Sequence, residues 1–307
     1  MSKAFDRATW PIILASLFDL GASYDCLIWI YNFLTDRQQI ITHGRNAPSP
    51  SVHISSGTPQ GSIISPILFA CLMSTLKTAS KNAIFVKYAD DVTLITWYTH
   101  QSNLQREIDN LLDWCKSNDM KINPSKTKII HHCGKKHSLP PSVTINSTRI
   151  DVCSEAKFLG VILSSDLKWD KHLDSTIKRA SKIAFILLQM KRAGCNDLIL
   201  RKYYQATCRS ILSYCFPAMC NMPNSLKSTI AKCERRCLNI VGLRPTTNVI
   251  TYCIQLCENL KQNVLNNPDH PLRKLLSIHQ RNTRSRGLVI PSTRTSRLAN
   301  SFIKFFS

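Results

Sequence analysis

Residues 85–95 read FVKYADDVTLI, and this stretch decides the fold of the first half of the chain. One short apolar run covers residues 84–86 and a second covers residues 92–95. Two such runs separated by a polar pair are typical of a β-hairpin, so we predict a turn at Asp90 and Asp91. Taken alone, paired aspartates in a turn most often mark a solvated turn.

The two aspartates are also candidates for chemistry. Phosphoryl transfer with two Mg²⁺ ions requires carboxylates that hold the ions about 3.5–4 Å apart over the reacting phosphate. Mg²⁺ prefers oxygen ligands and retains several of its waters. Neighbouring residues of a regular strand point to opposite faces, whereas a tight turn lets their side chains converge. Asp90 and Asp91 are therefore candidate metal ligands.

A glycine-containing loop lies upstream of the predicted hairpin, where residues 56–66 read SGTPQGSIISP. Glycine allows a backbone to approach a ligand closely. The apolar residues 63–76 predict a helix that carries Pro66 in its first turn. The N-terminus of a helix is positively polarised, so this junction could hold an anion.

The charge of the chain indicates its partners. Forty Lys and Arg stand against nineteen Asp and Glu, which gives the 307 residues a formal net charge of +21. An excess of this size predicts a polyanion or an anionic membrane surface as the partner. The competing interpretation is a basic soluble protein with a solvated surface, and we favour nucleic acid. No apolar stretch approaches the roughly 20 residues of a membrane helix, and no secretory signal is recognisable. We expect an intracellular protein of the nucleus or cytoplasm, not secreted and without a membrane partner.

Apolar periodicity predicts an α+β part followed, from about residue 170, by a helical part. Helices are predicted within 8–36 and 104–115, and strands at 38–43, 52–55, 120–122, 128–132, 143–152 and 158–163. Further helices are predicted at 171–191, 197–214 and 226–238. Residues 261–307 carry nine Lys or Arg against one Asp, which predicts a basic, partly disordered tail.

Two cysteine pairs have the spacing of metal ligands. Cys233 and Cys237, like Cys253 and Cys257, are four residues apart, which places both thiols on one helix face and is compatible with zinc. No neighbouring Cys-x-x-Cys or histidine pair completes a ligand set. We therefore favour buried, reduced cysteines.

Five short elements occur in the order found in reverse transcriptases. Within residues 2–161 they are SKAFD at 2–6, GTPQGS at 57–62, YADD at 88–91, NPSKTK at 123–128 and FLGV at 158–161. In the helical part, SILSY at 210–214 resembles a further recurrent element of the family. The chain therefore resembles the reverse transcriptase of a non-LTR (LINE-type) retrotransposon.

The resemblance implies both a fold and a reaction. The fold would be an α+β right-hand polymerase palm over residues 1–165, with an antiparallel sheet backed by helices, then a helical thumb and connection over 166–260 and the basic tail over 261–307. The reaction would be RNA-directed DNA synthesis, by two-metal transfer of a nucleotide to a primer 3′-OH. Mg²⁺ would be the cofactor, with Mn²⁺ as an alternative. An RNA template, a DNA primer and deoxynucleoside triphosphates would be the partners.

The resemblance also assigns roles to individual residues. Catalysis and metal binding fall to Asp90 and Asp91. The primer-grip region is Phe158, Leu159 and Gly160. Nucleotide or template binding falls to Phe5, whose ring would exclude a ribose 2′-OH, and to Gln60, Gly61 and Tyr88. Lys126 or Lys128 would be the basic residue near the leaving pyrophosphate. A plain core aromatic is the competing interpretation for Phe5, and a solvated face is the competing one for both lysines.

The sequence departs from the family at its first motif, which has a catalytic aspartate five residues before the phenylalanine. Counted back from Phe5, that position precedes Met1. We therefore expect an N-terminally truncated chain whose polymerase site is impaired, because one of three metal-binding carboxylates is missing. Two alternatives stay open: a non-catalytic nucleic-acid-binding remnant, and a polymerase like the intron maturases.

Overall fold

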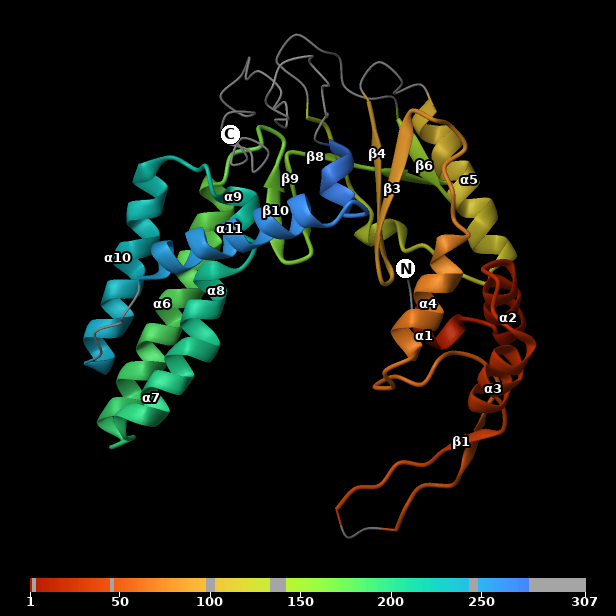
Figure 1. The fold of residues 1–307 in the computed structure, drawn as a ribbon, viewed down its shortest axis with the longest axis horizontal. Coiled ribbons are helices and arrows are strands. Elements are labelled where there is room, and N and C mark those ends of the chain that lie inside the picture. The colour runs from red at the N-terminus through yellow and green to blue at the C-terminus, as the bar shows by residue number, and fades with distance from the viewer. Residues whose placement is uncertain (2–3, 45–46, 98–102, 133–141, 243–247, 276–307) are drawn as a thin grey trace. The chain divides into compact units, whose positions relative to one another are not determined.

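A computed structural model describes residues 1, 4–44, 47–97, 103–132, 142–242 and 248–275 (Figure 1). The chain divides into two compact units, Met1–Cys153 and Ser154–Ser307. Both units mix helices and strands, so a mixed helix-and-sheet fold is confirmed.

Helices supply most of the core of the first unit. Pro11 and Pro66 lie in the first turns of two of them, where a missing N–H leaves no hydrogen bond unmade. Ser23 caps a third by accepting a hydrogen bond from the Cys26 amide at 3.3 Å. The described helices of this unit are α1 (Ala4–Arg7), α2 (Trp10–Asp19), α3 (Tyr24–Leu34), α4 (Ser65–Ser74) and α5 (Leu104–Ser117). Their buried side chains include Ile13, Leu17, Leu34, Leu68, Phe69 and Leu72.

The described strands of the first unit pair two by two. Antiparallel pairs are β1 (Arg37–Gln39) with β2 (Val52–Ile54), β3 (Ala83–Tyr88) with β4 (Asp91–Thr96), and β6 (Val143–Ile145) with β7 (Thr148–Ile150). β5 (Ile129–Ile130) pairs in parallel with β8 (Val152–Cys153). The hairpin of β6 and β7 packs on α5 through a small core of Ile108, Val143, Ile145 and Ile150.

One strand prediction in this unit is wrong. Residues 120–122 form no strand, because the Met120 amide donates to the Cys115 carbonyl at 2.7 Å and so stays bonded to the end of α5. Asp119 before it takes a left-handed φ of 50°. The chain then enters the short 3₁₀ helix η2 (Pro124–Lys126).

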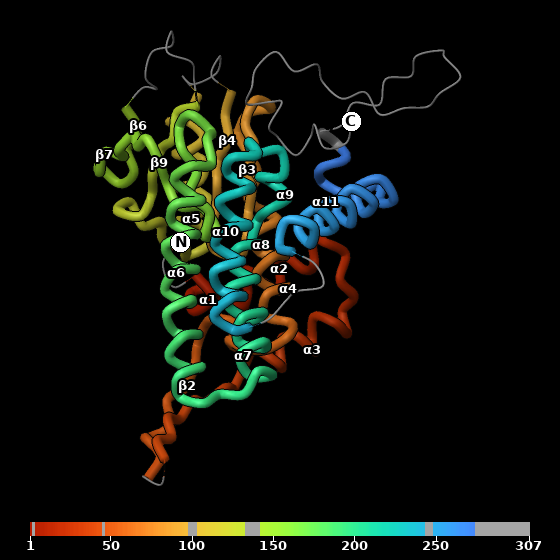
Figure 2. The backbone as a smooth tube through the Cα atoms, turned by 90° about the vertical axis from the view of Figure 1, so that its left-hand side faces the viewer, coloured from red at the N-terminus to blue at the C-terminus, as the bar shows by residue number. Residues whose placement is uncertain are grey.

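The second unit begins with a hairpin of β9 (Glu155–Phe158) and β10 (Val161–Ser164), which corrects the single β element predicted at 158–163. Helices follow, and α6 and α10 run side by side (Figure 2). The described helices are α6 (Asp170–Arg192), α7 (Asp197–Tyr203), the π-helical η3 (Tyr204–Arg209), α8 (Ser210–Ser213), α9 (Phe216–Met219), α10 (Asn224–Val241), α11 (Val249–Asn266) and the 3₁₀ helix η4 (Pro271–Leu275).

The three helices predicted in the second unit are confirmed, with α7, η3 and α8 together covering the range predicted at 197–214. The composition change at residue 261 does not coincide with the end of an element, because α11 continues to Asn266 and buries Val264. The rest of the predicted tail, from residue 276, lies outside the described residues. Among the helices described, none is both long and apolar enough to cross a membrane.

The cysteines of the second unit mostly lie in its core. Cys237, Cys253 and Cys257 are fully buried, as predicted, and Cys233 is half-buried. The Cys237 sulfur lies 3.3 Å from the sulfur of Cys208, and burial raises the pKa of Cys253 to about 12. The Cys253 thiol is therefore protonated at neutral pH.

Candidate active site

The hairpin of β3 and β4 carries the aspartate pair at its tip (Figure 1). Tyr88 pairs with Asp91, so the turn consists of Ala89 and Asp90, and Ala89 adopts a left-handed φ of 48°. The predicted hairpin is confirmed, but its turn starts one residue earlier than predicted. Asp91 is already the first residue of β4, and its side chain is exposed.

The start of the chain lies beside this tip. The N-terminal ammonium of Met1 donates a hydrogen bond to the Asp90 carbonyl at 2.9 Å. The same nitrogen lies 3.8 Å from Oδ2 of Asp90, whose side chain is 42 % exposed. The tertiary structure therefore brings the N-terminal segment, which contains Phe5, next to the aspartate pair, although the two are distant in the sequence. In the described part of the chain, no group of three or more His, Cys, Asp or Glu side chains is arranged to hold a metal ion.

Phe5 is half-buried in the core of the first unit. Its ring stacks on Phe69 of α4, with ring centroids 4.3 Å apart and planes inclined by 22°. The competing interpretation of Phe5 as a core aromatic therefore has a direct contact in its favour. The contact also fixes the ring in place, as a steric role against a sugar hydroxyl would require.

The loop that contains Gln60 is bound to α1 through backbone and side chains. The Gly57 amide donates to the Ala8 carbonyl and the Thr58 amide donates to the Phe5 carbonyl, both at 2.9 Å. Gly57 has a φ of 81°, and a Cβ atom there would lie 2.8 Å from the Phe5 oxygen. Only glycine fits this approach, which is the physical reason for its place in the loop.

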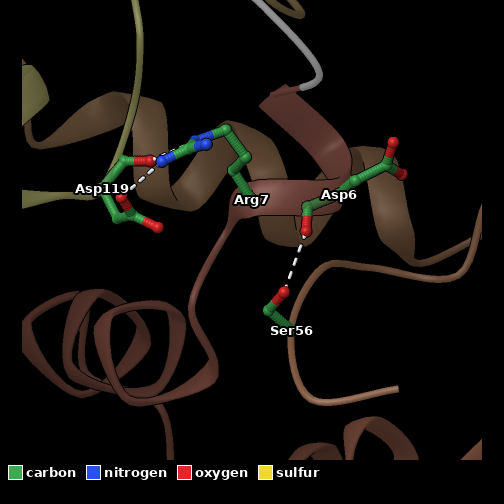
Figure 3. A network of polar contacts seen from close by, with 4 residues as sticks. All are labelled: Asp6, Arg7, Ser56 and Asp119. Carbon is green, nitrogen blue, oxygen red and sulfur yellow. Dashed lines mark hydrogen bonds and ion pairs between the residues drawn. The ribbon is translucent and has the colours of Figure 1, made fainter. Parts of the chain in front are cut away.

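Asp6 links this loop to the first segment at two points. Its backbone oxygen accepts a hydrogen bond from Oγ of Ser56 at 3.0 Å, as Figure 3 shows. Its carboxylate accepts a hydrogen bond from the side-chain amide of Gln60 at 2.8 Å. Sequence reasoning assigned no role to Asp6, although its position next to Phe5 in the first motif was a signal.

Further hydrogen bonds connect the loop and α1 to other parts of the first unit. Nε1 of Trp10 and Nη2 of Arg37 both donate to the Gly57 carbonyl, at 2.9 and 2.7 Å. Arg7 donates from Nε to the Asp119 carbonyl at 2.8 Å and from Nη2 to Oδ1 of Asp119 at 2.6 Å (Figure 3). Sequence reasoning missed all of these residues, because their partners are distant in the sequence.

Lys87 holds the hairpin against α4. Its ammonium donates to the carbonyl oxygen of Met73, at 2.7 Å, in the last turn of that helix, and to that of Leu76, just beyond its C-terminal end. A cation is favourable there because the last carbonyls of a helix lack partners. Burial lowers the pKa of Lys87 below its ordinary value, and the charge of Lys77 lowers it further.

The two candidate lysines of the next motif are exposed. Lys126 ends η2, in which the Asn123 side chain accepts a hydrogen bond from the Ser125 amide at 3.1 Å. Nζ of Lys128 lies 3.8 Å from the sulfur of Cys153. Within the described residues, no hydrogen bond or ion pair joins either lysine to Asp90 or Asp91.

The predicted primer-grip residues lie at the tip of the β9–β10 hairpin in the second unit: Phe158 ends β9, and Leu159 and Gly160 form the turn. Leu159 and Gly160 take left-handed φ values of 45° and 85°, and Phe158 pairs with Val161. The Tyr214 hydroxyl donates to the Leu159 carbonyl at 2.6 Å. The structure thus joins two elements that the family resemblance identified separately.

Comparison with known proteins agrees with this arrangement of motifs. The family described as reverse transcriptase (RNA-dependent DNA polymerase) matches residues 1–163. The "Probable RNA-directed DNA polymerase from transposon BS" of Drosophila melanogaster is 29% identical over 198 residues, 58% of this chain and 21% of that protein. The RNA-directed DNA polymerase from mobile element jockey of Drosophila funebris is 28% identical over 192 residues, 57% and 20% of the two chains.

The chain belongs to the reverse transcriptase family, because the match covers more than half of its length. Its similarity to the mobile-element enzymes further identifies it as a reverse transcriptase domain of the non-LTR, LINE-type retrotransposons. The chain spans about a fifth of the length of the curated relatives it matches.

Proposed function

We propose that this chain provides a site for RNA-directed DNA synthesis at the tip of the β3–β4 hairpin, with residues 1–165 as the palm and 166–260 as the helical thumb. The observation that carries the proposal is the meeting of three motifs. Asp90 lies beside the first segment through Met1, and Asp6 of that segment binds Gln60 of the loop. We propose that a nucleotide held by the loop faces the aspartate pair.

The donor set of the tip suits Mg²⁺. Asp90 and Asp91 offer carboxylate oxygens; the Asp90 side chain is 42 % exposed and Asp91 is exposed as well. Mg²⁺ is often bound by one or two carboxylates, with substrate phosphates and water completing its shell. The bound ions would neutralise the triphosphate and activate the primer 3′-OH. The protein would orient the nucleotide through Gln60, Gly61, Tyr88 and Phe5, and the primer through residues 158–160.

Primer extension on poly(rA)/oligo(dT) with Mg²⁺ tests this function. We would compare the chain with a second form in which a family-like segment ending in aspartate is joined to Met1. Because the Met1 nitrogen lies 2.9 Å from the Asp90 carbonyl, the added residue would start at the aspartate pair. We expect the extended form to incorporate nucleotide faster by orders of magnitude, since a third carboxylate would complete the metal site. Equal rates would contradict the proposed impairment, and no incorporation by either form would contradict the function.

A second candidate function is nucleic-acid binding without catalysis. It is favoured by the formal net charge of +21. This candidate predicts salt-sensitive binding to the same primer–template and no incorporation by either form.

Asp6 offers a test of the nucleotide position. We expect Asp6→Ala to raise the KM for nucleotide about three- to tenfold, because Gln60 loses a hydrogen bond worth about 0.5–1.5 kcal/mol. Asp6→Asn should retain the wild-type KM, because its amide oxygen can still accept from Gln60. Asp113→Ala on α5 is the control for the lost charge. A KM that Asp6→Ala leaves unchanged would show that Gln60 does not contact the nucleotide.

A further inference from the structure

A lysine of β3 is turned inward while its apolar neighbours are turned outward. Alternate residues of a strand share one face, and Lys87 is half-buried on the same face as Phe85 and the buried Ala83. Ile84 and Val86, on the opposite face, are 45 % and 41 % exposed. Burial of apolar surface alone would favour an apolar residue in the place of Lys87. The inward ammonium therefore requires specific polar partners.

These partners are backbone carbonyls at the end of α4. The Lys87 ammonium donates to the Met73 oxygen at 2.7 Å and to the Leu76 oxygen. The end of a helix presents carbonyls without helical partners and a partial negative charge, which suits a cation. Among the ion pairs of the described residues, none includes Lys87. Its charge is therefore spent on joining β3 to α4, which lie next to each other in Figure 1.

Lys87 belongs to the last inward-facing pair before the tip of the hairpin. Its cross-strand partner Val92 is half-buried against the core of the first unit. The tip beyond this pair, residues 88–91, is mostly exposed, and it receives the hydrogen bond from Met1. Three residues, or roughly 10 Å of strand, separate Lys87 from Asp90. The position of the aspartate pair therefore depends on how Lys87 and Val92 are held.

The same helix binds the glycine-containing loop at its other end. Oγ of Ser65, the first residue of α4, donates to the Pro59 carbonyl of the loop at 2.7 Å. Phe69, farther along α4, stacks on Phe5. A helix of this length, about 15 Å, holds its two ends at a fixed distance. The loop and the hairpin are therefore attached to one rigid element, and Lys87 is the polar link of the hairpin to it.

We infer that Lys87 is a positioning residue of the polymerase site: by binding the end of α4, it sets where the aspartate pair lies relative to a nucleotide held by the loop. The inference rests on the proposed function for the roles of the aspartate pair and the loop. Lys87 acts through the hairpin and touches neither substrate nor metal. A misplacement of reacting groups by about 1 Å can reduce a rate about a hundredfold. Loss of the link should therefore affect turnover more than binding.

Hydrogen exchange of the whole chain, followed by mass spectrometry, tests the link without any need for activity. In Lys87→Met, we expect the backbone amides of residues 84–95 to exchange at least about tenfold faster than in the wild type, because the hairpin loses two hydrogen bonds from a charged group. The hairpin of β6 and β7 in the same unit should exchange at the wild-type rate. Lys87→Arg should restore slow exchange, because a guanidinium can also donate to the last carbonyls of a helix.

Lys81→Met is the matched control. It removes the same charge at an exposed position two residues before β3, and it should leave the exchange of the β3–β4 hairpin unchanged. Wild-type exchange in Lys87→Met would overturn the inference. Equally faster exchange in both hairpins would overturn it too, since that result would indicate a general loss of stability.

Primer extension then separates positioning from a purely structural role. In whichever form of the chain incorporates nucleotide, we expect Lys87→Met to lower kcat about ten- to hundredfold and to leave the KM for nucleotide within about twofold. Lys87→Arg should recover most of kcat. A wild-type kcat in Lys87→Met, or a loss in KM alone, would overturn the positioning role. No incorporation by any form would instead contradict the proposed function, and the exchange measurement would still decide whether Lys87 holds the hairpin to α4.

Discussion

Replacement of both Asp90 and Asp91 by asparagine is expected to reduce nucleotide incorporation at least about a thousandfold, in whichever form of the chain is active in primer extension. Asparagine keeps the size of each side chain but removes the two negative charges that would bind Mg²⁺. The hairpin itself should persist, because its register is set by backbone pairing from Ala83–Thr96 to Tyr88–Asp91. Loss of activity would therefore be chemical and not structural.

A matched control strengthens this experiment. Asp109→Asn with Asp113→Asn makes the same charge change at two exposed positions of α5 and should leave incorporation unchanged. Binding of Mn²⁺, followed by electron paramagnetic resonance, gives a readout that does not depend on turnover. We expect the Asp90 and Asp91 variant to bind Mn²⁺ more weakly than the control. If the variant retains both metal binding and incorporation, the site lies elsewhere.

Gly57→Ala is expected to have the largest effect on stability. The new Cβ would lie 2.8 Å from the Asp6 Cα and from the Phe5 oxygen, which are backbone atoms that cannot move aside. A non-glycine residue at the φ of 81° adds strain of about 1–3 kcal/mol. With the clash, the free energy of unfolding should fall by roughly 3–5 kcal/mol.

Gly61→Ala is the natural control for this change. Gly61 has a similar φ of 90°, but nothing lies within 4 Å of the Cβ position. It should show the conformational strain alone, about 1–3 kcal/mol. Urea unfolding of both variants, followed by circular dichroism, measures the difference. Equal losses would show that the close approach of the loop to α1 contributes nothing to stability.

Local patterns in the sequence determined much of the fold. The two apolar runs around Asp90 and Asp91 predicted the β3–β4 hairpin, because alternation and turn residues act over a few neighbours. Helical periodicity likewise predicted α6 and α10. The prediction at 120–122 failed because the Met120 amide remains bonded to the end of α5. In addition, Arg7, which is distant in the sequence, donates a hydrogen bond to the carbonyl of the preceding Asp119.

The sequence also determined which residue types are available for chemistry and which family the chain belongs to, because motif order needs no coordinates. Only the tertiary structure decided what these residues contact. It placed Met1 against Asp90, Asp6 against Gln60 and Tyr214 against Leu159. It also turned Glu234 inward, where its carboxylate accepts hydrogen bonds from the Tyr204 hydroxyl and the Val249 amide. The physical reason is that hydrogen bonds between distant residues depend on how whole elements pack, and no local pattern records that packing.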